Sequence, residues 1–190
     1  EIPRESSVIG RYSTLPYYKE LEEDLLYNDS GLINSYRQHN WIASFEYYHA
    51  VKPYTFETWT DENFFTCDYP GPFVVKGKTN SRKFQWDRLM FAKDKRTALE
   101  ISAELCNDGL IGPQGIIYRK YEPLKLVEIG LNGLPFSHEF RFFFFKEKRL
   151  AHGYYWSLAR NPEGITIDRK GISFARRIAK LLAPHLTFFV

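Results

Sequence analysis

The first fifty residues alternate between strand-like and helix-like hydrophobic spacing. Val8, Ile9 and Tyr12 predict a short strand, and leucines that recur at helical spacing in 17–26 predict a helix after it. Residues 32–33 predict a second strand, and Ser35 is suited to cap a helix running through 36–49. Three residues are suited to begin the first helix, namely Ser13 or Thr14 as its cap and Pro16 in its first turn. This β-α-β-α order is typical of the start of an α/β layer.

The middle of the chain predicts a small sheet with one covering helix. Residues 52–70 contain prolines and show no hydrophobic period, so we expect an irregular connection there. The pattern then predicts, in chain order, a strand at 73–78, a turn, a strand at 84–92, a helix at 95–106 and a strand at 115–121. Glu122 and Pro123 end this segment, because proline lacks the N–H that a strand ladder needs.

The last third predicts an antiparallel strand pair, a helix and a further strand. The paired strands are expected at 137–145 and 149–156, and the run 142–145 is interpreted as buried. The period of two puts Glu139 and Arg141 on one face of the first strand, where an exposed ion pair of small value is the alternative to a site. An amphipathic helix is expected next, with Ile172, Ala175, Ala179 and Leu182 inward and Arg176, Arg177 and Lys180 outward, and a strand begins at Leu186.

Composition narrows the class of protein. The chain has 190 residues, of which 44% are hydrophobic and 17% aromatic, so it is globular and long enough for one domain or two small ones. Its net charge of +3 is too small to impose nucleic-acid binding by charge alone. No apolar run in the sequence is long enough to span a membrane. Cys67 and Cys106 match neither a disulfide framework nor a zinc-binding spacing, which favours a reducing cytoplasm.

The densest group of cations lies on the predicted strand 73–78 and the turn that follows it. Within this short stretch the chain carries four cations and no acid: Lys76, Lys78, Arg82 and Lys83. Gly77 and Ser81 mark a turn with small side chains and many backbone donors, which suits a phosphate group. The combination predicts binding of a polyanion, most simply a nucleoside triphosphate. The alternative is a hairpin with a basic, solvated turn.

The string Gly77-Lys78-Thr79 is similar to the end of a Walker A loop, but its spacing excludes that loop. A Walker A loop has four residues between its first glycine and the Gly-Lys pair, whereas five residues separate Gly71 from Gly77. Those intervening residues also predict a strand, whereas a P-loop lysine opens a helix. We therefore exclude a P-loop nucleoside triphosphatase.

Four strings along the chain resemble an ATP-grasp clade. They are, in this order, VIGRYSTLPYYKELEEDL, LINSYRQH, PFVVKGKTNSRKFQW and HEFRFFFFKEKRLAHGYYW. The clade is associated with phages and bacteria and is noted for an arginine and two lysines. The resemblance implies a mixed α/β (α+β) ATP-grasp fold, with a partial pre-ATP-grasp α/β unit at 1–70, the small subdomain with its phosphate-binding loop at 71–124, and the large subdomain at 125–190.

The same resemblance implies roles for individual residues. Lys76 is similar to the lysine that reaches the nucleotide phosphates, and Arg141 to the arginine that stabilises the transferring γ-phosphoryl group, with Glu139 to orient it. The segment 78–83 resembles the mobile flap over the phosphates, and its implied contacts are Lys78, Thr79, Asn80, Ser81, Arg82 and Lys83, the last also implied in catalysis. The implied hinge holds adenine through backbone groups and the ribose through an acid, and consists of Arg119, Lys120, Tyr121 and Glu122, with Glu122 as the acid.

The implied chemistry is activation of a carboxylate in the cytoplasm. ATP phosphorylates an acceptor carboxylate, on a small molecule or a peptide, and an amine or similar nucleophile attacks the resulting acylphosphate. Mg²⁺ would bridge the β- and γ-phosphates. The family's usual metal ligands, an Asp on one strand and a Glu and Asn on the next, are expected just past Val190, and another strand and helix are expected before the segment that begins at Val8.

Two other functions are compatible with the sequence. In the first, residues 76–88 track the phosphates of a nucleic acid while aromatic side chains stack on its bases. In the second, the chain uses ATP to modify a protein carboxylate or terminus. Further candidate substrate contacts are Arg37, Gln38 and His39, with a polar helix face as the alternative, and the aromatic run 154–156, with a packed core as the alternative. Arg11 and Ser13, at a strand end of the first unit, are candidate contacts as well.

Overall fold

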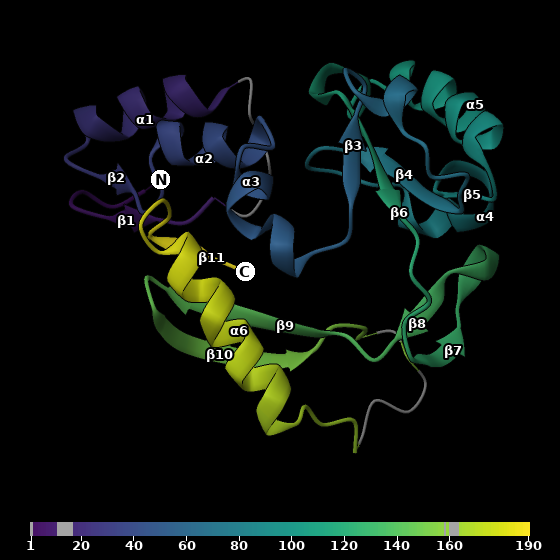
Figure 1. Ribbon diagram of the computed structural model, residues 1–190. Helices are drawn as coiled ribbons and strands as arrows, with labels where there is room; N and C mark the ends of the chain where they lie inside the picture. Colours follow the sequence, from purple (N-terminus) through teal and green to yellow (C-terminus); the bar gives the residue numbers. More distant parts are fainter. Residues whose placement is uncertain (1, 11–16, 158, 160–163) are drawn as a thin grey trace. The chain divides into compact units, whose positions relative to one another are not determined.

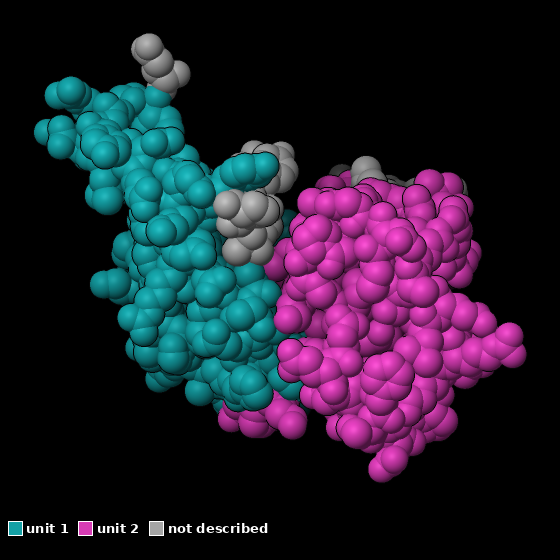
Figure 2. Space-filling view, turned by 90° about the horizontal axis from the view of Figure 1, so that it is seen from above, with its two compact units in different colours: residues 1–51, 141–153, 167–190 teal, residues 52–140, 154–166 magenta. Residues whose placement is uncertain are grey.

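A computed structural model describes residues 2–10, 17–157, 159 and 164–190 (Figure 1). These residues divide into two units, which are coloured separately in Figure 2. Unit 1 is made of residues 1–51, 141–153 and 167–190, and unit 2 of residues 52–140 and 154–166. The division of the chain into subdomains at 1–70, 71–124 and 125–190 stays a prediction.

Unit 1 combines both ends of the chain with most of a strand pair. Its elements are β1 (Ser7–Val8), α1 (Tyr18–Tyr27), β2 (Gly31–Leu32), α2 (Tyr36–Ala43), α3 (Tyr47–Val51), β9 (Phe140–Phe145), β10 (Lys148–Tyr154), α6 (Arg169–Leu182) and β11 (Phe188–Phe189). β1 and β2 pair in parallel, and β9 lies between β10 and β11 in a three-stranded sheet. The predicted β-α-β-α order at the start of the chain is therefore confirmed.

The core of unit 1 lies between α6, α2 and the sheet. The apolar face of α6 packs there through Ala175, Ala179 and Leu182, against Trp41 and Phe144. Figure 1 shows α6 crossing β9 and β10. Asn34 also fastens β11 to this unit: its side-chain oxygen accepts from the backbone N–H groups of Thr187 and Phe188, both at 2.9 Å. Phe189 of β11 is buried in the same core and stacks on Phe144, so this short strand is held by packing as well as by these bonds.

Unit 2 contains the middle of the chain. Its elements are the 3₁₀ turn η2 (Lys52–Tyr54), β3 (Thr58–Thr60), η3 (Phe64–Thr66), β4 (Phe73–Gly77), η4 (Lys83–Gln85), α4 (Trp86–Leu89), β5 (Phe91–Ala92), α5 (Lys95–Cys106), η5 (Gly112–Gln114), β6 (Ile116–Lys120), β7 (Leu126–Ile129), η6 (Leu131–Gly133) and β8 (Pro135–Ser137). The four-stranded sheet has the antiparallel order β3-β6-β4-β5, and β7 and β8 form a separate hairpin.

One face of the four-stranded sheet forms the core of unit 2. Phe73 and Val75 of β4 are fully buried and pack with Ala98, Ile101 and Leu105 of α5. The predicted helix 95–106 is confirmed, and Asp94 caps it by accepting the N–H of Thr97 at 2.8 Å. Because successive side chains of a strand point to opposite faces, Val74 and Lys76 lie on the other face.

Two predicted elements were wrong in type or extent. The strand expected at 84–92 is instead η4 and α4 followed by the two-residue β5, and Met90 donates its N–H to the carbonyl of Trp86 as a helical residue does. The apolar residues there recur at spacings of three to four, not two. The helix expected through 36–49 is capped by Ser35 as predicted, but it breaks between α2 and α3, where Phe45 takes a φ of 71° and stacks on Tyr48.

Three further predictions need correction. The expected irregular segment 52–70 contains β3, which pairs with β6. This strand was missed because three residues are too few to show a period. The long strand expected at 137–145 is divided into β8 and β9, and of the run 142–145 only Phe144 is buried, while Phe145 is 40% exposed. The start proposed for the first helix at Ser13, Thr14 and Pro16 lies outside the described residues.

Candidate functional site

Lys76 defines the candidate site on the face of the unit 2 sheet that lies opposite α5. The register pairs Lys76 with Ile117 and Val74 with Arg119, so these four side chains share the face opposite α5. Arg119 is the diagonal neighbour of Lys76, and its Nε donates to the Thr58 hydroxyl at 3.3 Å. The sheet thus holds two cations side by side on a partly buried surface.

The surroundings of Lys76 disfavour its positive charge. Burial is the main cause that lowers the pKa of Lys76, followed by the charges of Arg119 and Lys83, and the pKa falls to about 8. We call Lys76, Lys83 and Arg119 the cation cluster. A buried cation whose charged neighbours are also cations is electrostatically costly, and an anion bound among them would remove that cost. The cluster therefore has the chemistry of an anion site.

Lys83 is held in the cluster by aromatic side chains. Its Nζ hydrogen bonds to the Tyr155 hydroxyl and lies 4.4 Å from the centre of the Tyr155 ring and 5.4 Å from that of Trp156. Glu139 anchors both aromatic residues, because its carboxylate accepts from the Trp156 indole at 2.8 Å and its carbonyl accepts from the Tyr155 N–H at 2.9 Å. This arrangement fixes an amine that would otherwise move on a flexible side chain.

The loop between Lys76 and Lys83 is fastened by polar contacts. The Thr79 N–H and hydroxyl both donate to the Gln114 side chain, at 3.3 and 2.6 Å, and the Asn80 amide donates to the Thr79 hydroxyl at 3.1 Å. Arg82 makes a bidentate pair with Asp108, with both N···O distances at 2.6 Å. That pair with Arg82 is the main cause that lowers the pKa of Asp108. Lys78 and Ser81 lie half-buried in the same loop.

The predicted hinge begins with the last two residues of β6, Arg119 and Lys120, and continues through Tyr121 and Glu122. Lys120 and Glu122 form an ion pair at 2.7 Å, which is the main cause that raises the pKa of Lys120. The backbone N–H groups of Lys120 and Tyr121 donate to the carbonyls of Glu57 and Pro72, at 2.8 and 2.9 Å. Both N–H groups are therefore already used within unit 2.

The structure brings together only part of the predicted site. Lys76, Lys78, Thr79, Asn80, Ser81, Arg82, Lys83, Arg119, Lys120, Tyr121, Glu122 and Glu139 all belong to unit 2. Arg141 lies on β9 in unit 1 and is exposed, so its part in the site stays a prediction. Arg11 and Ser13 lie outside the described residues. Among the described residues, no group of three or more His, Cys, Asp or Glu side chains is arranged to hold a metal ion.

Sequence reasoning missed two residues that shape the loop, Gln114 and Asp108. Asp108 precedes a glycine after the end of α5, which is a turn signal, and its Oδ1 accepts from the N–H of Leu110 at 2.9 Å. That signal indicates a turn but does not identify Arg82 as a partner 26 residues away. The role of Gln114 has no signal in the local pattern.

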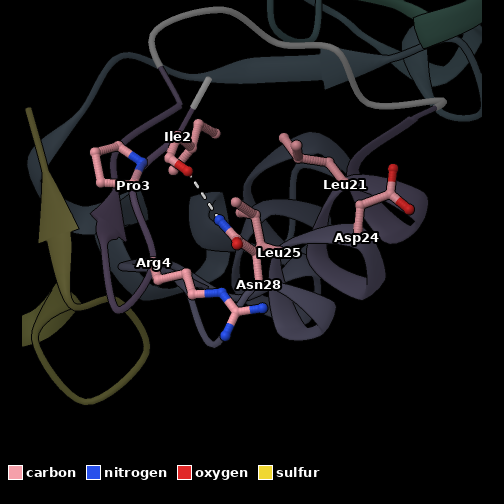
Figure 3. A pocket seen from close by; sticks show the side chains of 7 residues that line it. All are labelled: Ile2, Pro3, Arg4, Leu21, Asp24, Leu25 and Asn28. Atoms are coloured by element: carbon pink, nitrogen blue, oxygen red, sulfur yellow. Dashed lines mark hydrogen bonds between the residues drawn. The ribbon is translucent and has the colours of Figure 1, made fainter.

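A pocket on unit 1 is distinct from these residues (Figure 3). It lies between the first residues of the chain and α1, and the Asn28 side chain donates to the carbonyl of Ile2 across it at 2.8 Å. It is lined by Ile2, Pro3, Arg4, Leu21, Asp24, Leu25 and Asn28. None of the predicted site residues that the structure describes contributes to it.

Comparisons with known proteins identify the fold. No protein-family model matches the chain, and a search of curated proteins gave no significant match. Among solved structures, a RimK domain ATP-grasp protein from Sphaerobacter thermophilus is similar, with a TM-score of 0.55 and 14% identity over 92% of this chain and 63% of that one. A D-alanine–D-alanine ligase from Helicobacter pylori is similar with a TM-score of 0.53 and 9% identity, over 88% of this chain and 51% of that one.

The chain therefore has a mixed α/β fold of the kind found in ATP-grasp proteins, as the sequence predicted. It spans less than two thirds of either similar structure. At these identities the likeness concerns the fold, and activity has to be argued from the site itself. Among the described residues, no helix has the length and apolar character needed to cross a membrane.

Proposed function

We propose that the chain binds ATP beside the cation cluster of unit 2 and uses this ATP to activate a carboxylate for attack by an amine or similar nucleophile. The observation that carries this proposal is the cation cluster, in which Lys76 has a pKa of about 8 beside Arg119 and Lys83. Three cations close enough to act on one another in a partly buried site match the several negative charges of a triphosphate. The ATP-grasp fold supports the same ligand by analogy.

In this proposal each part of the site has a separate task. Lys76 and Lys83 neutralise phosphate charge, and the loop residues Lys78, Thr79, Asn80, Ser81 and Arg82 cover the phosphates. Because the N–H groups of Lys120 and Tyr121 are already used, the hinge would hold the adenosine through its other backbone groups and through Glu122. Arg141 would stabilise the transferring γ-phosphoryl group, with Glu139 as its orienting acid.

The proposed reaction has two steps. A carboxylate oxygen of the acceptor attacks the γ-phosphorus of ATP, the bond to the bridging oxygen breaks, and ADP leaves with the electron pair. The nucleophile then attacks the acyl carbon, phosphate leaves, and the nucleophile loses a proton. Such transfer depends mainly on positioning and charge neutralisation, which the cations of this site supply. Mg²⁺ is the usual partner of the phosphates in such transfers, but we assign it no ligand, because the described residues offer no cluster that fits it.

The test of this proposal is ATP binding by the chain and by a Lys76→Met variant, measured by calorimetry and thermal shift with Mg²⁺ present. Loss of a contact to a charged group costs about 1.5–3 kcal/mol, so we expect ATP affinity to fall by about 10- to 100-fold. The matched control is Lys93→Met, which removes an exposed lysine of the same unit and should leave affinity unchanged. Absence of a thermal shift at millimolar ATP, or an equal shift in Lys76→Met, would refute the ATP site.

Carboxylate activation needs a separate measurement. Acylphosphates react with hydroxylamine to form hydroxamates, so hydroxamate should accumulate when the chain is incubated with ATP, hydroxylamine and the correct carboxylate. Release of ADP should depend on the same carboxylate. ATP hydrolysis that no member of a panel of amino acids and acidic peptides stimulates, with no hydroxamate, would contradict the ligase reaction while leaving the ATP site in place.

A further inference from the structure

Helix α6 has two faces of opposite character. Its apolar face packs in the unit 1 core through Ala175, Ala179 and Leu182. The opposite face is exposed and carries five cations: Arg169, Lys170, Arg176, Arg177 and Lys180. The helix contains no acidic residue from end to end. We call these five side chains the basic face of α6.

The charges of this face are arranged differently from those on the other long helix. On α5, Arg96 pairs with Glu100 at 3.0 Å, and Glu104 pairs with Arg88. Within the part of the chain that the structure describes, no ion pair is found for Arg169, Lys170, Arg176 or Lys180. Mixed charge is the common pattern of a solvated helix, because alternating signs avoid repulsion. A face of one sign retains that repulsion and favours an anionic partner.

The spacing of the basic face suits a repeating anion. At 3.6 residues per turn, the five cations fall within an arc of about 120°, and Arg169 and Lys180 lie about 16 Å apart along the helix axis. Phe174, 47% exposed, lies at the edge of this arc. A row of cations over three turns contacts several phosphates of a polynucleotide at once, and an aromatic ring beside it offers a surface for a base.

We infer that the basic face of α6 binds the phosphate backbone of a nucleic acid, independently of the proposed ATP site. A membrane surface is a weaker fit, because a helix that binds lipid inserts its apolar face, and here that face forms part of the core. A second copy of the chain could offer the acids of α1, Glu20, Glu23 and Asp24. These three acids all lie within residues 20–24 of α1, which is little more than one helical turn. They therefore do not form a row that matches the cations over three turns of α6.

The test uses the whole chain with a fluorescent single-stranded oligonucleotide of about 20 bases, titrated over a range of salt concentrations by anisotropy. The Arg169→Gln/Lys180→Gln double variant removes two contacts, so the slope of log K against log salt should become shallower by about 1.4, and affinity at 0.15 M salt should fall about tenfold. The matched control is Lys19→Gln/Lys93→Gln, which removes two exposed lysines from α1 and from the segment before α5. Its slope and affinity should equal those of the unaltered chain.

Each other outcome would overturn the inference. Absence of salt-dependent binding would show that the basic face is only a solvated surface. Equal losses in both double variants would show that net charge, and not α6, is responsible. Binding abolished by Lys76→Met or by ATP would place the oligonucleotide at the cation cluster. If the oligonucleotide does not bind but the chain sediments with anionic phospholipid vesicles, the partner is a membrane. If the oligonucleotide does not bind but the chain self-associates, and Arg169→Gln/Lys180→Gln abolishes this, the partner is a second copy.

Discussion

The cation cluster of unit 2 and the basic face of α6 both gather positive charge, but they do so at very different cost. Lys76 is largely removed from water, and Arg119 and Lys83 repel it, so its pKa falls to about 8. The cations of α6 are exposed, and water screens them from one another. Folding therefore works against the charge of Lys76, whereas the side chain of Lys180 stays exposed to water.

This difference indicates which kind of anion each group suits. A buried cluster that repels itself gains most from a compact anion that enters among its members, such as a triphosphate. An exposed row gains little from any single contact and needs many contacts at once, as a polymer provides. Charge counts alone do not separate the two cases, since both stretches are similarly basic in the sequence.

The largest effect that would sharpen this comparison is the pH dependence of stability. The pKa of Lys76 is about 8 when folded and near 10.5 when unfolded. Between these values the unfolded chain binds more protons, so the free energy of unfolding should rise with pH, by up to about 3 kcal/mol in all. Burial raises the pKa of Tyr118 to about 12, which makes the free energy of unfolding fall as the pH rises, but only above pH 10.

Urea unfolding at pH 7.5 and 9.5 would measure this effect. The unaltered chain should become more stable, relative to Lys76→Met, as the pH rises across that interval. Lys76→Met should also be the more stable of the two at pH 7.5, because it lacks the buried charge. Lys180→Met on α6 should follow the unaltered chain at both values. If the free energy of unfolding changed equally with pH in the unaltered chain and in Lys76→Met, the surroundings of Lys76 would not disfavour its charge.

How far the sequence predicted this site depends on the range of each interaction. Lys76 and the helix on the other face of its sheet were predictable, because β4 and α5 follow from periods visible within a few residues. The diagonal placement of Arg119 required the register of β4 against β6, which a local pattern does not contain. Tyr155 lies 72 residues beyond Lys83, and its role as the partner of that lysine depends on tertiary packing alone.

A second, smaller effect concerns Arg82, the cation in the loop after β4 that is paired with an acidic side chain. Its bidentate pair with Asp108 has side chains that are 36% and 17% exposed, whereas those of the Arg88–Glu104 pair are 69% and 45% exposed. Asp108→Ala should therefore lower the free energy of unfolding by about 2 kcal/mol, and Glu104→Ala by less than about 0.5 kcal/mol. Chemical denaturation of both variants would measure this. Equal losses would contradict a bracing role for the Arg82–Asp108 pair.

The smallest effect would test how Lys83 is held beside Lys76. Tyr155→Phe removes the hydroxyl that bonds Lys83 Nζ but keeps the ring beneath it, so ATP affinity should fall by about fivefold, as expected for one hydrogen bond of about 1 kcal/mol. The neighbouring Tyr154→Phe is the matched control, because the Tyr154 hydroxyl is buried with no hydrogen-bond partner among the described residues. Removing that hydroxyl should leave ATP affinity unchanged and should not lower stability. A fivefold loss in Tyr154→Phe as well would show that general packing of this strand, and not the position of the lysine, determines ATP binding.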